Sequence, residues 1–190
     1  MIGILLAAGF SRRFGAANKL LHPLPDGRAI AIASAEHLIT ALPVSVAVVR
    51  EGNQSLSDAL KALGFHVVYC ESDATQMADS LVLAIRYAAA LSATARGYVI
   101  ALADMPFIAP STINAVANAL AEGAEIVIPT YADKPGHPVG ISTKYKDALL
   151  QLSGDEGARS IIKQHIDKVL LLDCDDTGIL ADIDTPADLA

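Results

Sequence analysis

A glycine, a serine and basic residues follow the first apolar stretch of the chain, in a pattern typical of loops that bind anions. Residues 2–8 are apolar or glycine, and the chain continues through Gly9, Ser11, Arg13 and Lys19. Glycine tolerates positive φ and lets a ligand approach the main chain, so amides from Ala8 onward could face a triphosphate. Arg13 and Lys19 would neutralise its oxygens. The loop therefore predicts a site for a nucleoside triphosphate.

Neither of two familiar phosphate-binding loops accounts for this stretch. A P-loop has four residues between its glycines and Lys-Ser/Thr after the second, whereas here five residues separate Gly9 from Gly15 and Ala16 follows. The Gly-x-Gly-x-x-Gly pattern of dinucleotide-binding folds is also missing. The stretch has the glycines and basic residues of a phosphate-binding loop but matches neither pattern.

Three aspartates follow apolar stretches elsewhere in the chain, and they are candidate metal ligands. Asp104 comes directly after residues 98–103, whereas Asp182 and Asp184 lie at the end of a predicted strand over residues 179–183. Mg²⁺ prefers hard oxygen ligands, often binds through one or two carboxylates, and takes its other ligands from phosphates and water. Carboxylates facing an anion-binding loop are what Mg²⁺ chemistry on a nucleoside triphosphate requires.

Apolar strands and amphipathic helices must position these residues, and they alternate along most of the chain. Strands are predicted at 2–7, 44–49, 65–70, 98–103 and 125–129, with helices at 29–42, 55–63, 78–91 and from Pro110. This alternation predicts a three-layer α/β/α, Rossmann-like fold with a mostly parallel sheet. A Pro/Gly-rich loop over residues 134–142 is predicted to run into a short strand. Later segments include helices near 145–152 and 157–165, strands near 169–172 and 179–183, and a helix start at Thr185-Pro186, and some of the late strands are expected to be antiparallel.

Ligands of open α/β sheets bind at the carboxyl ends of the strands. We therefore expect the loops after Ala7, Cys70, Ala103 and Ile183 to lie near one another. The loop after Cys70 would bring Thr75, Gln76 and Ser80 to the same place as Lys19 and Asp104.

Length and charge limit the class of protein and of partner. The chain has 190 residues, 53% of them hydrophobic, which suits a single domain over residues 1–190. Its formal charge of −7 argues against a broad grip on nucleic acid or an anionic membrane. No cationic segment precedes the first apolar run, so we expect a cytoplasmic protein. Cys70 and Cys174 are interpreted as core residues.

Six dispersed segments resemble the MobA-like nucleotidyltransferases, most closely the molybdenum cofactor cytidylyltransferase branch. The first contains Leu6, Ala7, Ala8, Gly9, Ser11, Arg13, Gly15 and Lys19. The second is Gln76 to Leu81, where Gln76 replaces the usual glycine, and the third is Leu102 to Pro106, where Ala103 replaces glycine. Gly136-His137-Pro138, residues 154–159 and residues 182–186 complete the match in the family's order.

The resemblance implies a nucleotidyltransferase fold and a role for each matching segment. The first segment, with Thr75, Gln76 and Ser80, would bind the nucleotide. Asp104, with Asp182 or Asp184, would hold Mg²⁺, while Lys19, Arg13 and Asp104 would be catalytic. His137 and Pro138 would bind the acceptor.

The implied reaction transfers CMP from CTP to the phosphate of molybdopterin or molybdenum-loaded molybdopterin. A recipient molybdoenzyme or its chaperone is a further implied partner. The choice of CTP rests on Leu-Ala-Ala-Gly in place of the Leu-Ala-Gly-Gly of guanylyltransferases. Transfer from GTP, transfer to a sugar or alcohol phosphate, and a non-catalytic nucleotide-binding module that delivers a cofactor are the alternatives.

Each residue also has a purely structural alternative. Asp104 could cap a turn before Met105-Pro106, and Asp182 and Asp184 could cap the following helix. Lys19 and Arg13 could be solvated charges, Ser80 could cap its helix, and His137 could serve a turn. Arg159 could form a structural ion pair.

Overall fold

The computed structural model describes residues 1–9, 14, 18–71, 76–154 and 157–189. The strands are β1 (Ile2–Ala7), β2 (Ser45–Arg50), β3 (His66–Cys70), β4 (Gly97–Leu102), β5 (Ile126–Tyr131), β6 (Lys134–Pro135), β7 (Val139–Ser142) and β8 (Val169–Asp173). The α-helices are α1 (Ile30–Ala41), α2 (Gln54–Ala62), α3 (Met77–Leu91), α4 (Pro110–Ala121), α5 (Lys146–Leu150) and α6 (Arg159–Gln164). Short 3₁₀ helices are η1 (Lys19–Leu21), η2 (Thr143–Tyr145), η3 (Ile166–Lys168), η4 (Thr177–Leu180) and η5 (Pro186–Leu189).

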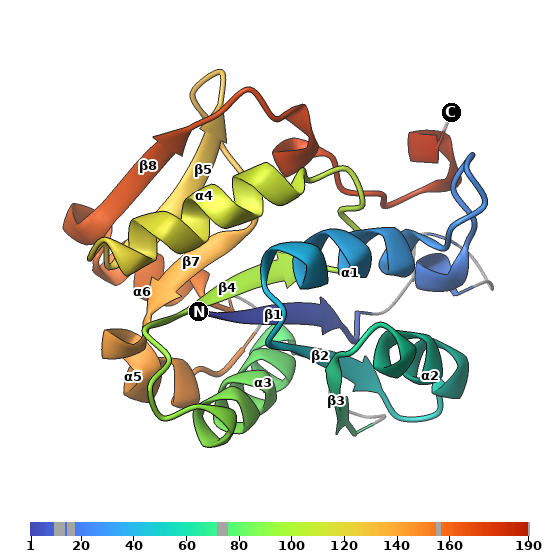
Figure 1. Ribbon diagram of the computed structural model, residues 1–190, viewed down its shortest axis with the longest axis horizontal. Helices are drawn as coiled ribbons and strands as arrows, with labels where there is room; N and C mark the ends of the chain where they lie inside the picture. The colour runs from blue at the N-terminus through green and yellow to red at the C-terminus, as the bar shows by residue number, and fades with distance from the viewer. Residues whose placement is uncertain (10–13, 15–17, 72–75, 155–156, 190) are drawn as a thin grey trace.

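The strands form one eight-stranded sheet that is parallel in its first half and mixed in its second (Figure 1). Strands β3, β2, β1 and β4 are parallel neighbours in that order. Strand β7 then lies antiparallel between β4 and β5, whereas β8 pairs parallel with β5. The predicted fold class, including antiparallel strands late in the chain, is confirmed.

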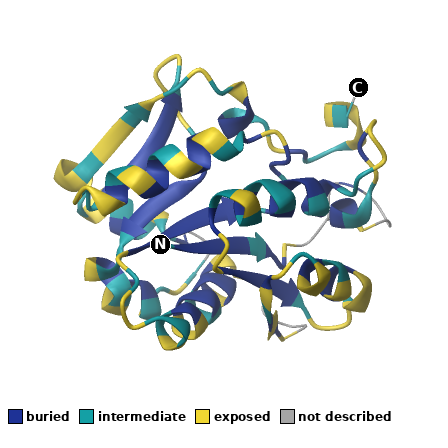
Figure 2. Ribbon diagram, in the orientation of Figure 1, coloured by how far each residue is buried: buried dark blue, intermediate teal, exposed yellow. Residues whose placement is uncertain are grey.

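Two apolar clusters cover the two faces of the sheet and make it the middle of three layers. Helices α1, α2 and α4 pack on one face, where Leu5 of β1 is buried. Helices α3, α5 and α6 pack on the other, where Ile4 of β1 is buried. Successive strand residues point to opposite faces, so a strand covered on both sides must be apolar throughout. Figure 2 shows the central strands buried along their lengths.

The predicted strand over residues 179–183 is wrong. Residues 177–180 form the 3₁₀ helix η4, and the chain then runs past the loop that follows β4. Its apolar residues are buried against that loop instead of in the sheet, and the Ile183 amide donates to the Asp104 carbonyl oxygen (2.9 Å). The helix predicted from Thr185-Pro186 is the 3₁₀ helix η5.

Gly178 sets how closely η4 approaches the loop after β4, which leads to a prediction about stability. A Cβ at Gly178 would overlap the backbone carbonyl of Phe107. We expect Gly178→Ala to lower the free energy of unfolding by about 1–3 kcal/mol, as overpacking does, measured by urea denaturation. Gly9→Ala is the control, because a Cβ there meets nothing within 4 Å. Equal stability of the two variants would contradict the prediction.

Both cysteines were predicted to be core residues, and the prediction is confirmed for only one of them. Cys70 is a buried free thiol, whereas Cys174 is also free but only partly buried, because it follows β8 at the edge of the sheet. Among the described residues, none of the helices has the length and apolar character needed to cross a membrane.

Candidate active site

The ammonium group of Lys19 lies between two carboxylates from distant parts of the chain. Its Nζ is 2.9 Å from Asp104 Oδ2 and 3.3 Å from Asp184 Oδ1. Lys19 is only 8% exposed. Burial works to lower the pKa of Lys19, but hydrogen bonds and charge interactions with Asp104 and Asp184 outweigh it and raise that pKa. The lysine is therefore a fixed, charged group at this site.

Local hydrogen bonds place each member of this group. The Asn18 side chain accepts from the Leu20 amide (3.2 Å) and so begins η1, whose first residue is Lys19. Two hydrogen bonds fix Ala103, the first residue after β4. Its amide donates to the Leu6 carbonyl (3.1 Å), and Ser34 Oγ of α1 donates to the Ala103 carbonyl (3.0 Å). Asp104 therefore emerges at the carboxyl end of β4, beside the end of β1.

Asp182 and Asp184 were candidates to cap the helix that begins at Pro186, but Asp188 provides the capping carboxylate. Its Oδ2 accepts from the Asp184 amide (3.0 Å) and the Thr185 amide (2.7 Å). The carboxylate of Asp184 instead reaches Lys19. Asp182 lies two residues earlier and lines the adjacent cleft. Because Ile183 is tied to Asp104, both aspartates lie next to the end of β4.

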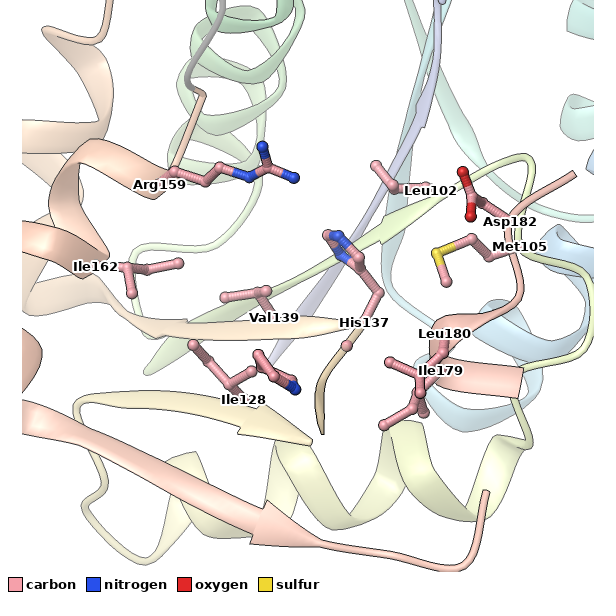
Figure 3. A pocket seen from close by; sticks show the side chains of 12 residues that line it. Leu102, Met105, Ile128, His137, Val139, Arg159, Ile162, Ile179, Leu180 and Asp182 are labelled. Carbon is pink, nitrogen blue, oxygen red and sulfur yellow. The ribbon is translucent and has the colours of Figure 1, made fainter. Parts of the chain in front are cut away.

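A cleft of about 440 Å³ lies beside Asp104 (Figure 3). Leu102 and Met105, on either side of Asp104 in the sequence, contribute to its wall, and His137, Arg159 and Asp182 supply its polar side chains. Gly136 allows the loop to approach η4, because a Cβ there would overlap the Ile179 carbonyl. The His137 amide donates to that same carbonyl (3.0 Å).

His137 is held in the cleft as a partly buried residue. Its Nδ1 atom is buried and has no hydrogen-bond partner in the part of the chain that the structure describes. Burial lowers the pKa of His137; the charges of Asp104 and Asp182 act to raise that pKa, and the charge of Arg159 acts to lower it. The ring is therefore neutral near pH 7 and can offer Nδ1 to a ligand. Pro138 follows it and is buried.

The remaining predicted nucleotide residues occupy the carboxyl ends of β1 and β3. Ala7 and Ala8 are buried, Leu6 is partly buried and Gly9 is exposed. Gln76 lies before α3, and its side-chain oxygen accepts from the Gly154 amide (2.9 Å), so it joins two loops. Ser80 is buried in α3. Ser11, Arg13 and Thr75 lie outside the described residues.

Arg50 is a functional candidate that the sequence did not reveal. It ends β2, between β1 and β3, and its guanidinium donates to the carbonyl oxygens of Ala8 (2.6 Å) and Glu71 (3.4 Å). It also lines a second hollow of about 360 Å³ together with Gly9 and Asn18. The sequence feature that could have indicated it is an arginine at the carboxyl end of an apolar strand. That strand lies between β1 and β3, whose following loops were predicted to bind the nucleotide.

The oxygen donors around Lys19 fit a divalent cation. Asp104 and Asp184 already share one positive group, and carboxylates are the protein ligands that Mg²⁺ uses. The described residues contain no group of three or more His, Cys, Asp or Glu side chains arranged for a metal. Two carboxylates are nevertheless enough where phosphate and water complete the coordination.

Comparisons with known proteins agree over nearly the whole chain. A family model described as the MobA-like NTP transferase domain matches residues 3–169. Purine catabolism protein PucB of Bacillus subtilis (strain 168) is 31% identical over 196 residues, which cover 98% of this chain and 92% of that protein.

Solved structures from Mycobacterium tuberculosis H37Rv are similar as well. Rv0371c is 29% identical with a TM-score of 0.82, over 99% of this chain and 95% of that one. Its complex with manganese is 28% identical with a TM-score of 0.77, over 98% and 94% of the two chains. A divalent metal is therefore found in a structure of this fold.

Proposed function

The chain belongs to the MobA-like NTP transferase family and is a nucleotidyltransferase, and from that premise we propose that it transfers CMP from CTP to the phosphate of molybdopterin or molybdenum cofactor. Residues 1–190 act in this proposal as a single catalytic domain in the cytoplasm. The observation that supports it most is the contact of Lys19 with Asp104 and Asp184 beside the cleft.

The reaction needs positioning and charge stabilisation more than a strong base. An acceptor phosphate oxygen attacks the α-phosphorus of the nucleotide, a new P–O bond forms, and pyrophosphate leaves with the electrons of the broken bond. A phosphate monoester has a second pKa of about 6, so the attacking oxygen is already ionised near neutral pH. Lys19 and Arg13 stabilise the negative charge on the triphosphate, and main-chain amides from Ala8 onward orient its oxygens.

Asp104 and Asp184 are the proposed ligands of Mg²⁺. They share Lys19, whereas Asp182 lies in the wall of the cleft, so we assign the second carboxylate to Asp184. When bound, Mg²⁺ would supply charge neutralisation on the phosphates. The manganese complex of Rv0371c supports a divalent metal.

The neighbouring cleft is the proposed acceptor site, with His137 and Pro138 in its wall or beside it. The assignment of molybdopterin and of a recipient molybdoenzyme or chaperone rests on the resemblance of the motifs. CTP is proposed because Leu6, Ala7, Ala8 and Gly9 match the cytidylyl pattern. A guanylyl transfer, or transfer to a sugar or alcohol phosphate, is the alternative within the same family.

Pyrophosphate release tests the proposal directly. Purified protein is assayed with Mg²⁺ and CTP, GTP, UTP or ATP, each with molybdopterin, a sugar phosphate or an alcohol phosphate as acceptor. We expect the largest kcat/KM with CTP and molybdopterin. A strong preference for GTP would overturn the cytidylyl assignment. Equal triphosphate binding with and without Mg²⁺, and no pyrophosphate from any acceptor, would favour the non-catalytic module.

Arg50 is expected to affect nucleotide binding because it holds Ala8, at the start of the predicted triphosphate-binding loop after β1. Arg50→Met removes the donors to the Ala8 and Glu71 carbonyls. Because hydrogen bonds from a charged group contribute about 1.5–3 kcal/mol, we expect KM for the nucleotide to rise on the order of 10-fold. Arg50→Lys should restore part of the loss in steady-state kinetics.

Arg96→Met is the matched control for Arg50, because Arg96 is an exposed arginine just before β4, at the amino end of that strand. An unchanged nucleotide KM in Arg50→Met would remove Arg50 from the site.

A further inference from the structure

The acceptor cleft has an apolar wall with few polar groups. Its apolar lining comes from β4, β5, β7, α6 and η4, through residues such as Leu102, Ile128, Val139, Ile162 and Ile179. A polyol bound here would leave several hydroxyl groups without partners, which costs free energy for each group buried. The cleft therefore suits an acceptor with an apolar or heteroaromatic body.

The polar groups of the cleft are separated along its length. In Figure 3, Arg159 lies on one side of His137 and Asp182 on the other, and the Arg159 guanidinium extends toward the imidazole. Asp182 is on the side of Asp104, because Ile183 next to it is hydrogen-bonded to the Asp104 carbonyl. The Asp182 side is therefore the end nearest Lys19, and the Arg159 side is the far end.

Arg159 at the far end and His137 next to it have polar atoms without partners among the described residues. No described residue makes a hydrogen bond or ion pair with the Arg159 side chain, which is exposed at the start of α6. The buried Nδ1 of His137 is also without a partner among the described residues. A buried polar atom in this state carries a desolvation cost that a ligand would relieve. Arginine presents a planar set of donors that matches a carboxylate or a carbonyl.

An acceptor must place its phosphate near Lys19 to reach the α-phosphorus, so its opposite end faces Arg159. On the basis of the proposed function, we propose that Arg159 and His137 form a distal anchor for the acceptor. The anchor selects phosphomonoesters whose apolar ring body carries a carbonyl or anionic group at the end opposite the phosphate. Arg159 donates to that group, and His137 Nδ1 exchanges a hydrogen bond with the edge of the ring body.

Two small probes separate the anchor from the rest of the acceptor site. They are 4-(phosphonooxymethyl)benzoate, which carries a distal carboxylate, and benzyl phosphate, which does not. With CTP and Mg²⁺, we expect Arg159→Met to raise the KM of the benzoate probe about 10- to 100-fold, since hydrogen bonds of charged groups contribute about 1.5–3 kcal/mol. The KM values of benzyl phosphate and CTP should not change, and Arg159→Lys should recover part of the loss.

Lys163→Met is the matched control, because Lys163 is another basic residue of α6 and does not line the cleft. His137→Gln keeps a hydrogen-bonding group, so it should raise the KM of the benzoate probe less than Arg159→Met does. An unchanged benzoate KM in Arg159→Met, or an equal loss for both probes, would overturn the anchor.

Binding measured without CTP distinguishes failure of the anchor from failure of the proposed function. Calorimetry should show the benzoate probe binding to the wild-type protein more tightly than benzyl phosphate, with the difference lost in Arg159→Met. No pyrophosphate from any acceptor together with this binding difference would reject the proposed reaction and keep the anchor. The absence of any binding difference between the probes in the wild-type protein would reject the anchor, whatever the kinetics show.

Discussion

Lys19→Met is expected to lower kcat by ~10²- to 10³-fold, the usual loss on removing one positioned group that stabilises developing charge. Methionine keeps much of the aliphatic chain of this buried residue but removes the ammonium group between Asp104 and Asp184. The two carboxylates are left facing each other without that cation. The loss should therefore exceed any effect of packing.

Pyrophosphate release under saturating nucleotide and acceptor measures this effect, and thermal unfolding shows whether the variant remains folded. Lys144→Met is the control, because Lys144 forms an ion pair with Glu125 (2.7 Å) while its side chain is 60% exposed. Turnover of a folded Lys19→Met protein near the wild-type value would exclude Lys19 from catalysis.

Asp104→Asn is expected to reduce turnover by at least ~10²-fold and to raise the Mg²⁺ concentration needed for half-maximal rate. Asparagine has nearly the same shape and can still accept a hydrogen bond from Lys19, so the local structure should persist. It does not carry the charge that makes a carboxylate a good ligand for a hard cation. The loss should therefore appear in the Mg²⁺ dependence as well as in the rate.

The same Mg²⁺ titration on Asp184→Asn and Asp182→Asn identifies the second carboxylate. We expect Asp184→Asn to follow Asp104→Asn, and Asp182→Asn to retain the wild-type Mg²⁺ dependence. Asp167→Asn is the control for a lost carboxylate, because Asp167 pairs with Lys168 on the surface with 67% of its side chain exposed. A normal Mg²⁺ dependence in Asp104→Asn would contradict the metal assignment.

The alternating part of the fold could be predicted from the sequence because its strands are buried on both faces. Such strands read as continuous apolar runs, and glycine and proline mark the ends of several neighbouring segments. The antiparallel position of β7 between β4 and β5 has no comparable local signal. It depends on pairing between residues far apart in sequence, such as Val99 with Gly140.

The C-terminal segment shows why an apolar run can mislead. Ile179 and Ile183 are buried, as strand residues would be, but they pack beside the loop after β4. The close approach at Gly178 and the hydrogen bond that the Gly178 amide donates to the Asp176 carboxylate (2.9 Å) favour a 3₁₀ turn. The close approach could not be read from the sequence, because it depends on the Phe107 carbonyl that lies opposite Gly178.

The candidate site was predictable where it depends on topology. Parallel strands deliver their following residues to one edge of the sheet, and this brings Lys19 and Asp104 into contact. Their catalytic roles remain predictions. Arg50 was missed because the described contacts of its guanidinium are with main-chain carbonyls, which leave no mark on the sequence. The capping role of Asp188 was missed because Asp182 and Asp184 precede Thr185-Pro186, where a cap is expected, whereas Asp188 follows it.

The most direct test is whether a metal held by Asp104 lies on the phosphates of the bound nucleotide. Mn²⁺ replaces Mg²⁺, and its paramagnetic relaxation of the phosphorus resonances of CTP is measured on the wild-type protein and on Asp104→Asn. We predict strong, protein-dependent relaxation of the triphosphate resonances in the wild type and its loss in Asp104→Asn at the same Mn²⁺ concentration. Equal relaxation in both proteins would show that Asp104 does not hold the nucleotide's metal.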